Sequence, residues 1–479
     1  MFAEPAGESG GRHPGIAVRA FRVDTVLKTL ADNEGLYLRE LAEFVGIPSV
    51  STDPAHAADV RRAAEWVAER LHKAGPIEVD MWETPRHPAV FGRWNVAPGA
   101  PTVLIYGHVD VQPADPVELW HSPPFVLTAR NGRLYGRGVS DDKASMLQPI
   151  LAAEAFFLAG EKPPVNLRFL FEAEEEIGSV DLPELVRTRR DDLACDVVLS
   201  TDGGMWRPEV PSITVSSRGL VALSFTLRGP RQDLHSGRHG GGIANPLHAA
   251  AELVASLHDD GRVAVAGFYD DVEEIDPALS KALERLTFDE KRYLADVGAP
   301  IGFGERGYGM LARQWYRPTL EVNGLYGGYQ GPGSKTVLPS EAHVKLTCRL
   351  VPNQRPDDVL AKVRLHLERR CPTGVNLTIE DEHEGAKAYR VSPDSPAVRV
   401  AAETLTEVFG MPPEIVGMGG TIPIVTTFRE VLGVDTVFFS FSTADENIHA
   451  PNEFYRPERF RLGLQAWARL WCRLSQNRC

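Results

Sequence analysis

The sequence predicts an α/β fold in which a mostly parallel sheet is interrupted by a second, α+β domain. The chain has 479 residues, more than a single hydrophobic core usually serves. Before residue 212 and again after residue 393, short apolar runs alternate with stretches at helical spacing, as in layered α/β sheets. Between these two segments the pattern changes to the two-residue alternation of half-exposed antiparallel strands.

The first domain is predicted to comprise residues 20–211 and 393–479. Apolar residues at helical spacing predict helices, which are expected at 24–46, 56–74 and 145–159. Apolar runs predict strands, which are expected at 102–106, 166–171, 196–199 and 435–441. Residues 1–20 lack the apolar segment of a signal peptide and are predicted to form a poorly ordered leader.

The second domain is predicted at residues 212–392. Residues 213–229 and 343–352 alternate like antiparallel strands. A helix is expected at 245–257, because Asn245 is a good N-cap and a proline follows it at the first helical position. We therefore expect a sheet covered by helices and inserted into the first domain.

Composition excludes some classes of partner and location. The net charge of -14 argues against nucleic-acid binding, because phosphate recognition needs a basic surface. No uncharged apolar run is long enough to cross a bilayer, so no membrane partner is expected. The odd number of cysteines and the absence of CxxC pairs predict free thiols in the cytoplasm; the five are Cys195, Cys348, Cys371, Cys472 and Cys479.

Polar motifs directly follow the apolar runs predicted to be strands. His108 and Asp110 follow the first run, and Asp202 follows the third. The second run leads into Glu174-Glu175-Glu176, and the last leads into a loop ending at His449. Because ligands bind at the carboxyl ends of strands in open α/β sheets, these side chains are expected to meet at one edge. Asp141 adds a carboxylate from a glycine-rich turn ahead of a helix.

Histidines mixed with carboxylates suit zinc, manganese or cobalt. A single histidine at a strand end is more often structural, and a Glu-Glu pair is usually a solvated surface. Together, two histidines and three carboxylates are too many ligands for one tetrahedral ion. They fit two divalent ions with one carboxylate shared between them. Glu175 and Glu176 point to opposite sides of an extended chain, so only one of them easily binds a metal.

The sequence resembles the family of carnosinase and cytosolic nonspecific dipeptidase, which also holds aminoacylase, acetylornithine deacetylase, succinyl-diaminopimelate desuccinylase and glutamate carboxypeptidase. The matching stretches span about residues 100–455 and keep the family's order; they are GHVDVQP, WHSPPF, GRLYGRGVSDDK, EEEIGS, DLHSGRHGGG, GSKTVLP, CRLVPN, GMGGTIPI and ENIHAPNE. The resemblance implies a di-metal hydrolase whose inserted domain serves as a lid and as the contact of a homodimer.

The resemblance also implies how the five ligands divide between two ions. His108 and Asp202 would hold one ion. Glu176 and His449 would hold the other, and Asp141 would bridge the two.

Other site residues follow from the same resemblance. Asp110 would orient the imidazole of His108. Glu175 would be the general base, taking a proton from a metal-bridging water and passing it to the leaving amine. The peptide bond between Asp141 and Asp142 would be cis.

Two further residues have both a structural and a functional interpretation. His235 precedes a Ser-Gly turn and could simply stabilise that turn; the resemblance implies that it stabilises the oxyanion, often in the partner subunit. Arg349 could be a packed strand residue, whereas the resemblance makes it an anchor for the substrate carboxylate, helped by Gly419, Gly420 and Thr421.

Three functions are therefore open. Hydrolysis of dipeptides is favoured, because Asp202 stands where the family's deacylases and carboxypeptidases generally have Glu. Removal of an acetyl or succinyl group from an N-acyl amino acid would use the same chemistry. A catalytically dead binding protein would have lost the base or a metal ligand, and this sequence retains all of them.

Overall fold

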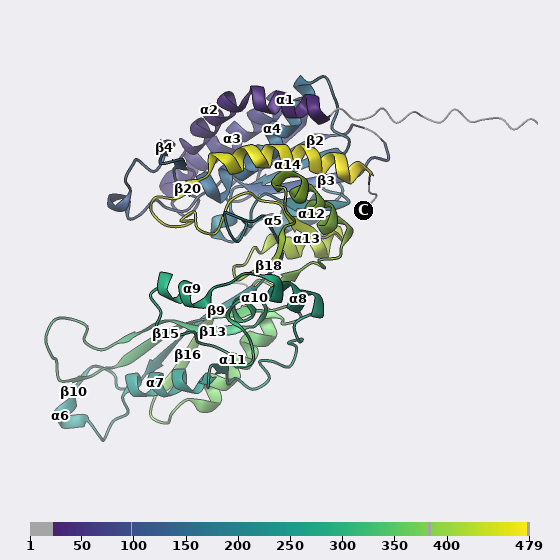
Figure 1. The fold of residues 1–479 in the computed structure, drawn as a ribbon. Coiled ribbons are helices and arrows are strands. Elements are labelled where there is room, and N and C mark those ends of the chain that lie inside the picture. The colour runs from purple at the N-terminus through teal and green to yellow at the C-terminus, as the bar shows by residue number, and fades with distance from the viewer. Residues whose placement is uncertain (1–22, 97, 382–384, 477–479) are drawn as a thin grey trace, which may run out of the picture.

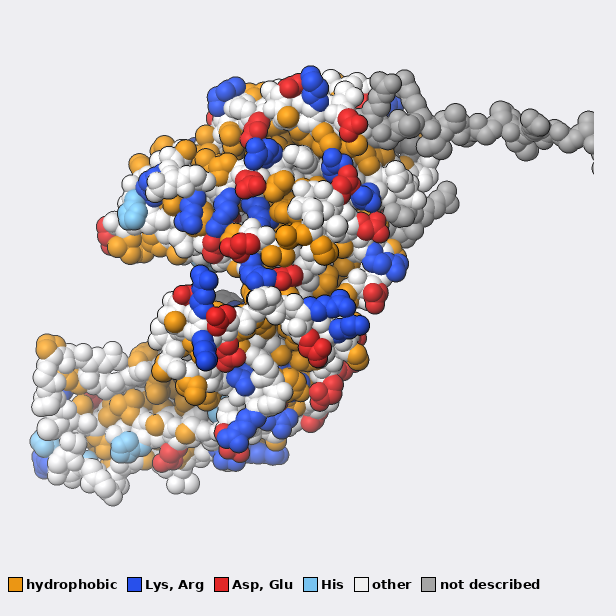
Figure 2. Space-filling view, in the orientation of Figure 1, with side chains coloured by type: hydrophobic (Ala, Val, Ile, Leu, Met, Phe, Trp, Pro, Cys, Tyr) orange, Lys and Arg blue, Asp and Glu red, His pale blue; other side chains and the backbone are white. Residues whose placement is uncertain are grey.

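The computed structural model describes residues 23–96, 98–381 and 385–476, which form two lobes (Figure 1). The upper lobe in that view contains the N-terminal and C-terminal parts of the chain, and the lower lobe contains the middle part. The surface is deeply indented between them (Figure 2). The leader predicted at residues 1–20 lies outside the described residues. Among the helices that are described, none is long and apolar enough to cross a membrane.

The first lobe is built on a six-stranded sheet, which confirms the predicted α/β fold. Its strand order is β1-β2-β6-β3-β7-β19. Strands β6, β3, β7 and β19 pair in parallel, whereas β2 is antiparallel to both of its neighbours. The strands are β1 (Glu78–Trp82), β2 (Ala89–Trp94), β3 (Thr102–His108), β6 (Asn166–Glu172), β7 (Val197–Ser200) and β19 (Thr436–Phe438). The C-terminal segment therefore supplies an edge strand of the sheet.

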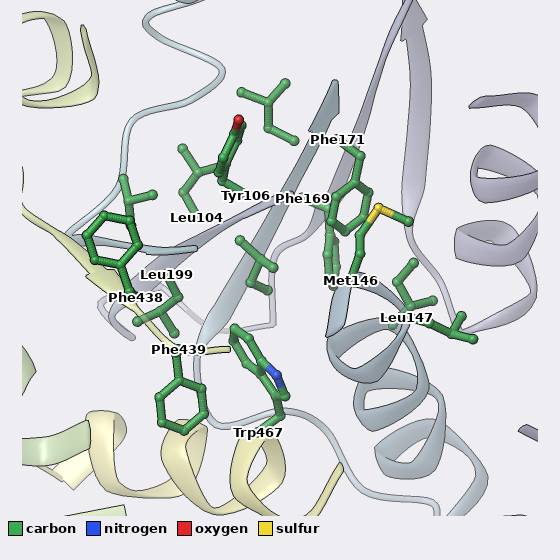
Figure 3. Packing of buried hydrophobic residues seen from close by; sticks show 14 of the residues in the cluster. Leu104, Tyr106, Met146, Leu147, Phe169, Phe171, Leu199, Phe438, Phe439 and Trp467 are labelled. Atoms are coloured by element: carbon green, nitrogen blue, oxygen red, sulfur yellow. The ribbon is translucent and has the colours of Figure 1, made fainter. Parts of the chain in front are cut away.

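Helices with one apolar face pack around this sheet. The almost wholly buried α4 contacts α1 and α14, and Trp467 of α14 packs edge-on against Phe439, which follows β19 (Figure 3). The helices of this lobe are α1 (Val23–Asp32), α2 (Glu34–Val45), α3 (Ala57–Lys73), α4 (Ala144–Leu158), α5 (Leu182–Thr188), α12 (Pro396–Phe409), α13 (Ile424–Leu432) and α14 (Pro457–Gln476). Because α4 begins three residues after Asp141, its packing places the end of the glycine-rich turn at the sheet edge.

A small sheet brings two distant loops together beside that edge. It has the order β20-β5-β4 and consists of β4 (Thr128–Arg130), β5 (Arg133–Tyr135) and β20 (Phe454–Tyr455). Phe454 pairs with Tyr135, so the loop that carries His449 lies next to the turn that carries Asp141.

The second lobe contains an antiparallel sheet with the order β13-β15-β9-β16. Helices α7 (Pro246–Ser256) and α11 (Pro356–Arg370) pack on this sheet and form a separate hydrophobic core with it. The side chain of Asn245 accepts a hydrogen bond from the Leu247 amide at 3.0 Å, which confirms the predicted N-cap. The strands of the sheet are β9 (Gly219–Arg228), β13 (Thr319–Gly327), β15 (Glu341–Leu350) and β16 (Asn376–Asp381).

Shorter elements complete the second lobe. They are β10 (Leu234–His235), α6 (Ser236–His239), β11 (His258–Asp259), β12 (Arg262–Val263), α8 (Pro277–Arg285), α9 (Glu290–Asp296), α10 (Met310–Tyr316) and β14 (Val337–Leu338). Strand β10 and helix α6 lie at the end of this lobe that is farthest from the first lobe (Figure 1).

A three-stranded sheet joins the two lobes. It contains β8 (Ser212–Ser217), β17 (Tyr389–Arg390) and β18 (Glu414–Met418), in the order β17-β8-β18. Ile213 on β8 packs in the first core, whereas Val221 on β9 packs in the second. Trp315, inside the predicted insert, also belongs to the first core. The domain limits 20–211, 212–392 and 393–479 remain a prediction, and the two separate cores support it.

Candidate metal centre

The carboxyl ends of three parallel strands carry the predicted polar motifs. His108 is the last residue of β3 and is fully buried. Glu175 and Glu176 lie in a short turn just beyond β6, whose Glu172 is in register with His108. Asp202 follows β7 by two residues. The pairing of these strands brings four side chains to one edge, which is where open α/β sheets bind ligands.

The five predicted ligands form two groups that share one residue. One group is His108, Asp141 and Asp202, and the other is Asp141, Glu176 and His449. Within each group the ligand atoms lie within 4.8 Å of one another. Oδ1 of Asp141 is 3.1 Å from Nε2 of His108, and Oδ2 of Asp141 is 3.0 Å from Nε2 of His449. A carboxylate that directs one oxygen into each group has the geometry of a bridging ligand.

Asp142 takes a different direction from its neighbour Asp141. Its Oδ2 accepts a hydrogen bond from the Thr201 hydroxyl, and its side chain is almost fully buried. The peptide bond between Asp141 and Asp142 is cis, as the sequence resemblance implies. Gly107 allows this packing, because a Cβ there would lie 2.3 Å from Thr201 Oγ1 and 2.7 Å from Asp142 Oδ2.

Asp110 connects the His108 imidazole to the turn of Glu175 and Glu176. Its Oδ1 lies 3.5 Å from Nδ1 of His108. Its carboxylate also accepts hydrogen bonds from the amides of Glu175 at 3.2 Å and Glu176 at 3.0 Å, and from the Ser51 hydroxyl at 2.6 Å. A carboxylate held by several donors is well placed to fix the orientation of a neighbouring histidine.

Sequence reasoning missed the carboxylate that holds the turn of Asp141. Glu453 is fully buried and accepts hydrogen bonds from the amides of Gly138 and Ser140 at 2.8 Å and of Asp141 at 3.1 Å. Arg137 Nη1 donates to the same carboxylate at 2.7 Å. Glu453 is the last residue of the ENIHAPNE motif, so its place in a family motif could have marked it as a site residue. Its hydrogen-bond partners, however, are revealed only by the folded chain.

Gln112 is a second residue that the sequence analysis did not assign. Its Nε2 donates to Oε2 of Glu176 at 2.7 Å. The same oxygen lies 3.2 Å from Nε2 of His449. Gln112 therefore helps to set the direction in which the Glu176 carboxylate points.

The carboxyl groups of the site outnumber its histidines, and burial disfavours the charged form of Glu175 and Asp202. Burial raises the pKa of Glu175 well above its usual value, and the charges of Asp202 and Glu176 raise it further against the opposing effect of His108. Burial and the charge of Asp141 raise the pKa of Asp202 to about 6. Divalent cations would relieve this crowding, so the residues present fit a two-metal site.

The two histidines already interact with the shared carboxylate. Burial opposes ionisation of Asp141, but hydrogen bonds from His108 and His449 outweigh it and hold the pKa of Asp141 below its usual range. Hydrogen bonds to Asp141 and Glu176 raise the pKa of His449 to about 10. The shared carboxylate is thus the most favoured anion of the cluster.

The predicted carboxylate anchor lies where the lobes join. Arg349, on β15, donates from Nη1 to the Thr421 hydroxyl at 2.7 Å. That hydroxyl in turn donates to the Arg218 carbonyl at 2.7 Å, and the Arg218 amide donates to the Gly420 carbonyl at 3.0 Å. The structure thus brings Arg349 together with the turn Gly419–Gly420–Thr421, which directly follows β18.

His235 does not join this chain's metal ligands. It lies on β10 at the far end of the second lobe and is exposed (Figure 1). Its Nδ1 accepts a hydrogen bond from the Gly237 amide at 3.0 Å. Within one chain His235 therefore has the contact expected of a turn residue.

A sequence model of Peptidase family M20/M25/M40 matches residues 104–473, which include all five candidate ligands. The chain belongs to this family. The match covers most of both lobes.

Relatives of known activity align along nearly the whole chain. A Cys-Gly metallodipeptidase of Schizosaccharomyces pombe is 30% identical over 459 residues, which are 92% of this chain and 96% of that protein. A human Beta-Ala-His dipeptidase is 29% identical and aligns with 92% of this chain and 90% of its own length.

Solved structures give the same picture. The dipeptidase Dug1p from Saccharomyces cerevisiae superposes with a TM-score of 0.83 at 26% identity, covering 96% of this chain and 99% of that one. An M20 family metallo-carboxypeptidase from Sulfolobus solfataricus superposes with a TM-score of 0.81 at 30% identity, covering 92% of this chain and 99% of that one.

Proposed function

We propose that this protein is a metal-dependent dipeptidase that uses two divalent ions, zinc or manganese or else cobalt. The observation that carries the proposal is the pair of ligand groups joined by Asp141, with the partly buried Glu175 beside them. The aligned relatives named as metallodipeptidases support dipeptides as the substrate class.

The ligand set divides between the two ions according to the two groups. His108 and Asp202 would hold one ion, Glu176 and His449 the other, and Asp141 would bridge them. When bound, two such ions polarise the scissile carbonyl and lower the pKa of the attacking water.

Glu175 is the general base in this proposal. It belongs to neither ligand group, and burial raises its pKa and so favours the protonated form, which suits a group that accepts a proton during the reaction. Its carboxylate takes the proton of the attacking water and then delivers it to the nitrogen of the leaving amino acid. Asp110 keeps the His108 ring in place during these steps.

Both ends of a dipeptide find complementary groups. Asp202 lies at the metal site and would help to hold the free ammonium group. Arg349, with the turn Gly419–Gly420–Thr421, would hold the free carboxylate as a planar donor. Fixing both ends selects a substrate two residues long, because a longer peptide carries its carboxylate beyond Arg349.

The second lobe would act as the lid and as the contact of a homodimer in the cytoplasm. His235 is exposed at the far end of this lobe, away from its own metal centre (Figure 1), which supports a role in a neighbouring subunit. In the dimer it would stabilise the oxyanion of the partner's substrate. A monomer in light scattering at micromolar concentrations would contradict this arrangement.

The metallo-carboxypeptidase relative supplies a specific alternative, because that enzyme class also acts at a free carboxylate. The metal-free protein should be reloaded with zinc, manganese or cobalt and assayed on dipeptides, tripeptides, tetrapeptides and N-acetyl or N-succinyl amino acids. If the proposal is correct, the enzyme hydrolyses dipeptides when metal is added and does not hydrolyse them without metal. Faster turnover of longer peptides than of dipeptides would favour a carboxypeptidase. Faster turnover of acylated amino acids than of dipeptides would favour a deacylase, and no turnover of any substrate would favour a binding protein.

A further inference from the structure

Arg218 contacts every residue of the turn that is proposed to receive the substrate carboxylate. Its Nε donates to the Gly419 carbonyl at 3.1 Å, and its amide donates to the Gly420 carbonyl at 3.0 Å. Its own carbonyl accepts the hydrogen bond of the Thr421 hydroxyl at 2.7 Å. One residue between β8 and β9 therefore holds three consecutive residues of the turn after β18.

The Arg218 guanidinium is close to a second one. The Thr421 hydroxyl accepts from Arg349 Nη1 at 2.7 Å and donates to the Arg218 carbonyl, so a single hydroxyl links the two arginines. Burial, followed by the positive charge of Arg349, lowers the pKa of Arg218 to about 10. Burial also lowers the pKa of Arg349.

Neither arginine forms an ion pair with a carboxylate in the part of the chain that the structure describes. Glu321 is close enough for its charge to favour protonated Arg218, but the two form no ion pair. Two half-buried cations of like charge without a counter-ion are unfavourable unless a ligand supplies the negative charge. A planar guanidinium beside another suits a carboxylate, which accepts hydrogen bonds on both oxygens.

The space around Gly419 is adapted to Arg218. A Cβ at Gly419 would lie 3.1 Å from Nη2 of Arg218 and 3.1 Å from the Gln314 carbonyl. The guanidinium thus lies close to the turn, and a side chain at position 419 would have to push it aside by a few tenths of an ångström.

We infer that Arg218 is a positioning residue for the substrate's terminal carboxylate: it holds the turn Gly419–Thr421 in place and adds a second positive charge beside Arg349. This inference rests on the proposed dipeptidase function. It implies that the enzyme selects the free carboxylate by charge as well as by the direct hydrogen bonds of Arg349.

The test compares Arg218→Gln, which removes the charge, with Arg218→Lys, which keeps it. Arg228→Gln is the matched control, because Arg228 lies at the other end of β9, is exposed and pairs with Glu341. For each metal-loaded enzyme we would measure kcat and KM for a dipeptide. The dipeptide amide would be measured as a competitor, so that its inhibition constant is obtained whether or not it is cleaved.

The expected result is a loss of preference for the free carboxylate. Arg218→Gln should raise KM for the dipeptide about 10-fold, the size of one nearby charge at a partly buried site, and change the inhibition constant of the amide little. Raising the ionic strength should reduce this difference. Arg218→Lys and Arg228→Gln should both keep the ratio of the dipeptide KM to the inhibition constant of the amide near that of the unmodified enzyme.

Other outcomes separate this inference from the proposed function. Equal losses on dipeptide and amide in Arg218→Gln, or a ratio in Arg218→Lys as poor as that in Arg218→Gln, would overturn the inference while the dipeptidase remains. Failure of the unmodified enzyme to cleave any dipeptide would overturn both. Thermal unfolding of each variant shows whether a loss of activity reflects misfolding. If Arg218→Gln is misfolded, the inference is judged on Arg218→Lys, from its ratio of the dipeptide KM to the inhibition constant of the amide.

Discussion

Replacing Glu453 by Gln should weaken both the fold and the metal site. Oε2 of Glu453 accepts from Arg137 and the Gly138 amide, and Oε1 accepts from the amides of Ser140 and Asp141. In the Gln variant an NH2 group replaces one of the two oxygens. Two of the four contacts then place this NH2 donor against another N–H donor, and these two hydrogen bonds are lost. It also leaves the guanidinium of Arg137 buried without its ion-pair partner.

The magnitude follows from these contacts. Two hydrogen bonds to a charged group contribute about 1.5–3 kcal/mol each, so their loss amounts to about 3–6 kcal/mol. Breaking a buried ion pair by removing one partner costs about 3–5 kcal/mol, which is the same effect estimated in another way. We therefore expect the free energy of unfolding to fall by about 3–5 kcal/mol.

Urea unfolding of the metal-free protein measures this change, with the exposed Glu118→Gln as the control. Because Glu453 holds the amide of Asp141, the variant should also bind metal less tightly, and excess metal should restore part of its activity. An unfolding free energy within about 0.5 kcal/mol of the unmodified protein would refute the reasoning, since that is the range of neutral surface changes.

Four other predictions concern the site itself. Glu175→Gln should keep both ions, measured by metal analysis, yet lose about 100- to 10,000-fold in kcat. Glu176→Gln should bind one ion less tightly, lose activity for that reason and regain part of it with excess metal. If instead Glu175→Gln lost metal and Glu176→Gln kept it, the roles of base and ligand would be exchanged between the two residues. Arg349→Ala should reduce kcat/KM strongly for a dipeptide and much less for its amide, and equal losses would make Arg349 structural. Gly107→Ala should destabilise the protein by about 1–3 kcal/mol in urea unfolding, because its Cβ would overlap Thr201 Oγ1; an unchanged midpoint would contradict this.

The sequence alone determined the fold class and the identity of the candidate ligands. Apolar runs such as residues 102–106 become buried strands because hydrophobic periodicity is local, and the polar residues that follow them must then lie at strand ends. His108 and Asp202 could be predicted in this way without knowledge of their neighbours. The order of the motifs along the chain supplied the family.

Only the tertiary structure decided how distant side chains meet. The ligand group that contains Asp141 and His449 depends on loops more than 300 residues apart, and so does the attachment of Glu453 to the Asp141 turn. The contact of Arg218 with the turn after β18 is of the same kind. The sequence suggested His235 as a site residue, yet within one chain it lies on β10, at the end of the second lobe that is farthest from the first lobe (Figure 1). Local periodicity sets where a strand or helix forms, but the partners of a buried charge depend on how the whole chain packs.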